Sequence, residues 1–172
     1  MPCVVGYNEH MESVQKNDIH ILFHNIRSAH NVGAMFRTAD AIGVSRVFIS
    51  GYTPCPLDRF GRPVAEIAKT GLGAELAIVW EYEKDPLEII NLHKLEGYFV
   101  LGIEQDKRAI DYKELPPPAK VLVIVGSEVE GISQSLRDAC GALVEIPMIG
   151  TKESLNVSVA FGIALFGLFD RQ

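Results

Sequence analysis

The chain has 172 residues, enough for one domain with a substantial core, and 48% hydrophobic and 22% charged residues are ordinary values for a globular protein. A net charge of −6 argues against a strongly basic nucleic-acid binder, and three cysteines without a C-x-x-C pair argue against a disulfide framework or zinc site and for a reducing cytoplasm. The N-terminus shows no signal-peptide pattern, and the C-terminal apolar run Leu155 to Phe169 is too short to span a membrane.

The first part of the chain alternates between apolar runs and helical patterns. A strand is predicted at Ile19–His24. A helix is predicted at Asn31–Gly43, where apolar residues recur at helical spacing and a glycine ends the pattern. Glycine and proline make Gly51–Pro63 a loop. The other elements expected are a strand at Val47–Ser50, a short helix at Val64–Thr70, a strand at Leu76–Trp80, a helix at Asp85–Glu96 and a strand at Tyr98–Ile103.

The last third repeats this alternation after a stiff connector of three prolines, residues 116–118. Its expected elements are a strand at Val121–Val125, a helix at Ser133–Cys140, a strand at Leu143–Ile146 and a helix at Leu155–Phe169. Strands that alternate with helices predict an α/β fold with a mostly parallel sheet flanked by helices. We expect one domain over residues 1–172, of which residues 1–17 form a loosely ordered arm.

Charge is unevenly distributed along this acidic chain. The segment from Arg27 to Lys69 holds six basic residues against three acidic ones, a surplus of three positive charges. A local basic face of this kind can bind a phosphate backbone, although a randomly basic surface explains the count equally well.

The polar residues of the first predicted helix form one candidate site. Asn31 stands where a helix N-cap belongs, and Arg37 projects from the polar side and leans over Gly33, which has no side chain. A cap and an exposed Arg37–Asp40 pair explain the same residues without any function. A functional interpretation therefore needs a partner site.

A glycine-containing turn follows the strand Val121–Val125. Gly126, Ser127 and Glu128 come directly after this strand, where open α/β sheets bind ligands. Gly126 permits a close backbone approach, and Glu128 is expected at the rim. The bland interpretation is an acidic surface turn whose carboxylates are solvated.

A second turn, with proline and glycine, follows the strand Leu143–Ile146. Gly150 allows a sharp bend, Ser154 can cap the final helix, and Asn156 then lies in its first turn. A plain serine cap explains Ser154, but it does not explain a polar Asn156 at the start of an otherwise apolar helix.

Together these segments resemble three motifs of the SpoU (TrmH) family of SPOUT RNA methyltransferases. The matching stretches, in the family's order, are NVGAMFRTA at Asn31–Ala39, GSEVEGIS at Gly126–Ser133 and IPMIGTKESLNVSVA at Ile146–Ala160. The third motif is long and highly specific, whereas the first motif is specific only when it occurs together with the other two. The resemblance extends over roughly Ile19 to Phe169.

The resemblance implies a C-terminal trefoil knot whose backbone binds S-adenosylmethionine in a bent shape. The cofactor positions that it implies are Gly126, Ile146 and Leu155, with Ser127, Met148 and Gly150 beside them. The implied reaction is methyl transfer to a ribose 2′-hydroxyl of tRNA or rRNA, without a metal.

Carried over from the family, the implied catalytic residues are Arg37, Asn31, Glu128, Ser154 and Asn156. Family resemblance gives Arg37 the activation of the hydroxyl. Because arginine scarcely loses its proton, clamping a phosphate and stabilising the alkoxide suits it better. The implied partners are RNA and a second copy of the chain that binds through the knot region, but no membrane. A SPOUT enzyme that methylates a base, and a catalytically silent module that binds the cofactor or RNA, stay open as alternatives.

Overall fold

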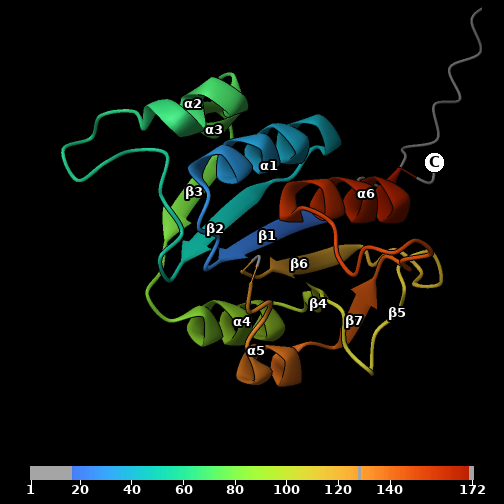
Figure 1. Ribbon diagram of the computed structural model, residues 1–172. Helices are drawn as coiled ribbons and strands as arrows, with labels where there is room; N and C mark the ends of the chain where they lie inside the picture. The colour runs from blue at the N-terminus through green and yellow to red at the C-terminus, as the bar shows by residue number, and fades with distance from the viewer. Residues whose placement is uncertain (1–16, 128, 171–172) are drawn as a thin grey trace, which may run out of the picture.

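The computed structural model describes residues 17–127 and 129–170. Within them, seven strands form one sheet in the order β3-β2-β1-β6-β4-β7-β5, and every neighbouring pair is parallel (Figure 1). The strands are β1 (Asp18–His24), β2 (Arg46–Ser50), β3 (Val79–Tyr82), β4 (Phe99–Ile103), β5 (Ile110–Asp111), β6 (Lys120–Val125) and β7 (Ala142–Glu145). The predicted α/β fold is confirmed.

Helices cover both faces of the sheet (Figure 1). One face carries α1 (Ala29–Ile42), α2 (Ala65–Gly71), α3 (Ala74–Ala77) and α6 (Val157–Phe169), and the other carries α4 (Pro86–Leu95) and α5 (Gln134–Ala139). The two layers bury separate apolar clusters, one around Phe23, Phe36 and Phe161 and the other around Leu122 and Ile90. None of the described helices has the length and apolar character needed to cross a membrane.

The central strands are buried on both sides, which explains why their sequences are continuous apolar runs. Residues 121–125 of β6 are all buried, and β6 lies between β1 and β4. A parallel sheet covered on both faces favours such runs over alternation of apolar and polar residues. The carboxyl ends of these strands meet at one edge of the sheet, and the glycine-rich turn after β6 begins there.

Helix α1 packs closely on α2 through a glycine. A Cβ atom on Gly33 would lie 2.1 Å from Thr70 Oγ1 and 2.3 Å from the Ile67 carbonyl oxygen. Gly33 is buried, whereas Arg37 is exposed. The small size of Gly33 therefore allows the close contact between α1 and α2. We interpret this contact, and not space for the Arg37 side chain, as the reason for a glycine at this position.

One local expectation was wrong. The segment Leu76–Trp80 was expected to be a strand, but Leu76 and Ala77 belong to α3, and β3 begins at Val79. The Glu75 carboxylate accepts a hydrogen bond from the Gly73 N–H at 3.0 Å and so supports the start of α3. The expected arm at residues 1–17 lies, apart from Asn17, outside the described residues. The single domain over residues 1–172 and the knot stay predictions.

Candidate functional site

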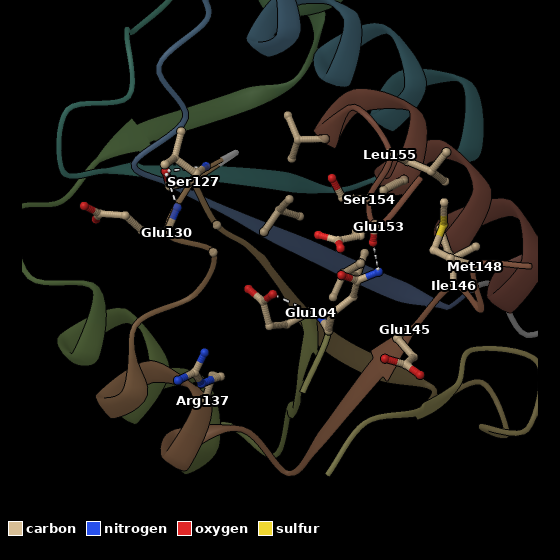
Figure 2. Close-up of a pocket in the computed structure, with 18 residues that line it drawn as sticks. Glu104, Ser127, Glu130, Arg137, Glu145, Ile146, Met148, Glu153, Ser154 and Leu155 are labelled. Carbon is tan, nitrogen blue, oxygen red and sulfur yellow. Dashed lines mark hydrogen bonds between the residues drawn. The ribbon is translucent and has the colours of Figure 1, made fainter. Parts of the chain in front are cut away.

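A cavity of about 460 Å³ opens at the carboxyl ends of β4, β6 and β7 (Figure 2). Its lining comes from three segments, the end of β4, the turn after β6, and the chain from β7 into α6, with Arg137 of α5 beside them. Figure 2 shows Ile146, Met148 and Leu155 together on one side and Ser127 and Glu130 on the opposite side. The cavity thus has an apolar wall and a polar wall.

The turn after β6 folds back tightly on itself. Gly126 is buried, and a Cβ atom on it would lie 2.5 Å from the carbonyl carbon and oxygen of Gly131. The Gly131 N–H donates to the Ser127 carbonyl at 2.9 Å, and Gly131 has a φ of +66°, which favours glycine. The hydroxyl of Ser127 accepts from the Val129 N–H at 3.2 Å. This packing holds the polar wall in place.

The apolar residues of the segment from β7 to α6 form the apolar wall. Ile146, Met148, Ser154 and Leu155 line the cavity, so the structure brings these predicted residues together with Gly126 and Ser127. Gly150 is exposed and is not among the lining residues. Glu128 lies outside the described residues.

The two helix caps differ from those expected. Helix α1 begins at Ala29 with Ser28 as its N-cap, and Asn31 donates its N–H to the Ser28 hydroxyl. Asn156, rather than Ser154, caps α6, since its side-chain oxygen accepts from the Ser158 N–H at 2.9 Å. Each wrong assignment has the same cause, because two cap-forming residues lie within one turn and the spacing of apolar residues favours neither.

The first and third motifs meet at their asparagines. Asn156 donates its side-chain amide to the Asn31 side-chain oxygen at 3.3 Å, although the two are 125 residues apart in the chain. Helix α1 is thereby joined to the start of α6, at the rim of the cavity where Leu155 lies. The pairing supports the interpretation that these motifs build one site.

A second hollow, of about 410 Å³, adjoins the cavity. The two share lining residues from the turn after β6, including Ser127 and Glu130, and the second hollow adds Arg27, Asn31 and Tyr52. The Tyr52 hydroxyl donates to the Ser127 hydroxyl at 3.3 Å. The site is therefore a pair of neighbouring hollows separated by the turn after β6.

Arg37 lines neither hollow. It is exposed on α1, six residues after Asn31, which places it about 9 Å farther along the helix axis. The structure does not bring Arg37 to the cavity of its own chain, and its catalytic role stays a prediction.

Sequence reasoning missed Glu104 and Gln105, which follow β4. The Glu104 carboxylate accepts a hydrogen bond from the Ile132 N–H at 2.6 Å, and the Gln105 side-chain amide donates to the Glu153 carbonyl at 2.7 Å. One dipeptide thus holds the turn after β6 and the segment before α6 at the same time. Polar residues directly after a predicted strand were the only available signal, because the partners are 28 and 48 residues away.

We expect Glu104→Ala to weaken binding of S-adenosylmethionine, the cofactor that the resemblance implies, about tenfold, since the Ile132 N–H loses a charged acceptor and the polar wall loosens. Glu104→Gln keeps an acceptor oxygen and should retain most of the affinity. Isothermal titration calorimetry of both variants measures the difference, with Asn91→Ala, a change at an exposed residue of α4, as the control. Unchanged affinity in Glu104→Ala would show that the contact does not shape the cavity.

The cavity is rich in carboxylates. Its described lining contains one arginine, Arg137, and four glutamates, Glu104, Glu130, Glu145 and Glu153. The Nε of Arg137 is 3.3 Å from Asp106 but donates no hydrogen bond to any described residue. This arrangement favours a ligand that carries positive charge, with room for a carboxylate near Arg137.

Two titratable groups near this edge have shifted pKa values. The backbone and guanidinium hydrogen bonds from Arg108 hold the pKa of Asp106 below its usual range, so Asp106 stays ionised beside Arg137. Burial lowers the pKa of His24 at the end of β1, and its imidazole contacts the Ser50 hydroxyl at 2.7 Å. His24 lines neither hollow.

Comparison with known proteins gives a consistent assignment. The model of the SpoU rRNA Methylase family matches residues 18–166. A Staphylococcus haemolyticus protein named for the TrmH family of tRNA/rRNA methyltransferases is 30% identical over 152 residues, which cover 88% of this chain and 58% of that protein. The chain thus spans about three fifths of the length of the curated relatives it matches.

Solved structures have the same architecture. The A. aeolicus TrmH/SpoU tRNA modifying enzyme has a TM-score of 0.77 and 25% identity, over 88% of this chain and 75% of that chain. An AdoMet-bound rRNA methyltransferase from Sinorhizobium meliloti has a TM-score of 0.78 and 27% identity, over 88% of this chain and 56% of that chain.

Proposed function

Because the chain belongs to the SpoU rRNA methylase family, we propose that it transfers a methyl group from S-adenosylmethionine to a ribose 2′-hydroxyl of tRNA or rRNA. The observation that carries the proposal is the convergence of all three motifs on one pair of hollows, through Gly126, Leu155 and the Asn31–Asn156 hydrogen bond. The ribose assignment rests on the form of the first and third motifs.

The residues of the cavity fit the cofactor. A volume of about 460 Å³ is in the usual range for small-molecule sites. The apolar side chains of Ile146, Met148 and Leu155 offer a slot for an adenine ring, and the carboxylates suit a group with a sulfonium and an ammonium charge. When bound, this cofactor supplies an already activated methyl group.

The chain's own residues position the substrate and stabilise charge. The second hollow, with Arg27 and Tyr52 in its lining, offers a cation for a phosphate and a phenol ring for a base. Asn31 and Asn156 lie where this hollow meets the start of α6, and their amides can orient a hydroxyl. Alignment of this kind contributes much of the rate in a transfer reaction.

We also propose that the active protein is a homodimer. Helix α6 exposes Val159, Ile163 and Phe166, which recur at helical spacing and form one apolar stripe. Burial of this stripe against a second copy would remove it from water, and Arg37 on the neighbouring α1 could then reach the cavity of the partner. The position of Arg37 outside the cavity of its own chain supports this arrangement.

The experiment that tests the function has two parts. Calorimetry of the purified protein without RNA is expected to show micromolar binding of S-adenosylmethionine, and absence of binding would contradict the cofactor assignment. Mapping of 2′-O-methyl positions in RNA from cells with and without the protein is expected to show a ribose position that depends on it. A base methylation in place of the ribose position, or no change in either, would favour the two alternative functions.

A further inference from the structure

The segment between β2 and α2 leaves the body of the molecule as a long loop (Figure 1). Its tip, Asp58–Arg62, is a turn held by internal hydrogen bonds. The Asp58 carboxylate accepts from the backbone N–H groups of Phe60 at 2.8 Å and Arg62 at 3.0 Å, and the Gly61 N–H donates to the Asp58 carbonyl at 2.9 Å. Gly61 has a φ of +74°, so this turn has a defined backbone shape that does not depend on packing of the Phe60 ring.

The tip presents an aromatic ring together with two cations. Phe60 is 65% exposed, and the guanidinium carbons of Arg59 and Arg62 lie 4.7 Å and 5.0 Å from its ring centroid. Arg62 is also held by Asp58 through a 2.8 Å ion pair. A single exposed apolar side chain is common on proteins, but an exposed ring that contacts two guanidinium groups on a preorganised turn is a more specific arrangement.

This combination matches the chemistry of unpaired RNA. Bases stack on aromatic rings and on guanidinium planes, and arginines bind the phosphates between them. The match has particular weight in a chain of net charge −6, where binding of a polyanion depends on local cations.

The loop is continuous with the proposed substrate hollow. It begins just after Gly51, and Tyr52, which is 55% exposed, lines the second hollow beside Arg27. A strand of RNA whose target nucleotide occupies this hollow could therefore follow the loop outward to its tip. We propose that Asp58–Arg62 binds unpaired nucleotides that flank the target nucleotide; this inference rests on the proposed function.

The test uses the full chain and a fluorescein-labelled single-stranded oligouridine, with fluorescence anisotropy as the readout. Phe60→Ala is expected to raise the dissociation constant about tenfold, because one base loses its stacking surface. Phe60→Trp should bind at least as well as the wild type, whereas Phe60→Leu should bind like Phe60→Ala. Arg59→Ala is expected to lower the slope of log affinity against log salt by about 0.7, the loss of one phosphate contact.

Matched control residues lie on α4, on the face of the sheet opposite to α1 and α2 (Figure 1). Leu95→Ala removes an apolar side chain that is 85% exposed, and Lys94→Ala removes an exposed cation, both on α4. Neither should change binding of the oligouridine. Because Phe60 contributes only its backbone to the Asp58 hydrogen bonds, the tip variants should keep the wild-type melting temperature and the wild-type affinity for S-adenosylmethionine.

The outcomes separate this inference from the proposed function. Wild-type binding of the oligouridine and of bulk tRNA, with unchanged affinity in both Phe60→Ala and Arg59→Ala, would overturn the role of the tip alone. A wild-type protein that bound S-adenosylmethionine but neither RNA would overturn the RNA methyltransferase proposal together with this inference. A Phe60→Leu variant that bound like the wild type would overturn stacking as the mode of binding.

Discussion

Arg37→Ala is expected to lower kcat for RNA methylation at least about a hundredfold while leaving the affinity for S-adenosylmethionine nearly unchanged. The side chain is exposed and lines neither hollow, so its removal does not alter the cofactor cavity. The loss should instead come from the missing guanidinium fork, which we propose clamps a phosphate and stabilises the developing alkoxide. Arg37→Lys keeps the charge without the fork and should recover only part of the rate.

The measurement is single-turnover methylation of bulk tRNA, with calorimetry of cofactor binding on the same preparations. Asp40→Ala, one turn farther along α1, serves as the control, because the bland interpretation of these residues is an exposed Arg37–Asp40 pair. Asp40→Ala should methylate at close to the wild-type rate. Wild-type kinetics in Arg37→Ala would show that the catalytic assignment is wrong, and equal losses in both variants would favour a structural pair.

Gly126→Ala is expected to abolish measurable cofactor binding and to lower the free energy of unfolding by about 1–3 kcal/mol. The new Cβ atom would lie 2.5 Å from the Gly131 carbonyl group and 2.6 Å from the Ile132 nitrogen. All of these are backbone atoms, so relief requires the whole turn after β6 to move. That movement would also disturb the hydrogen bond between the Ile132 N–H and Glu104.

Calorimetry and urea denaturation together check this expectation. Gly162→Ala is the matched control, because its Cβ atom would meet only Thr38 at an ordinary 3.7 Å, and alanine is favoured over glycine inside a helix. It should therefore retain cofactor binding and match or exceed wild-type stability. A Gly126→Ala protein with wild-type cofactor affinity would mean that the turn tolerates displacement and is not the rigid wall of the cavity.

Much of the fold could be predicted because its central strands are buried on both faces. Apolar runs of four to seven residues, separated by helical patterns, indicate a parallel sheet, and β1 and β6 were found at the expected positions. The start of β3 could not be predicted in the same way. Leu76 and Ala77 continue its apolar run, yet both donate backbone hydrogen bonds to the Gly73 carbonyl and belong to α3, whose start the Glu75 carboxylate supports.

The residues of the candidate site also fall into a predictable group and an unpredictable group. Gly126, Ile146 and Leu155 could be found because each belongs to a continuous motif. Glu104 and Tyr52 could not, since their contributions depend on which strands are neighbours. Glu104 reaches the turn after β6 because β4 pairs with β6, and Tyr52 reaches Ser127 from the far side of β1.

The hydrogen bonds of Glu104 and Gln105 have a consequence for the exchange of ligand. They fasten both walls of the cavity to the same strand end, so neither wall is an independent lid. A spent cofactor would then leave through one cooperative opening of the two loops, with β4 as their common hinge point. In the proposed methyltransferase, the two walls would then open together, and the two short hydrogen bonds of Glu104 and Gln105 would set the cost of that opening.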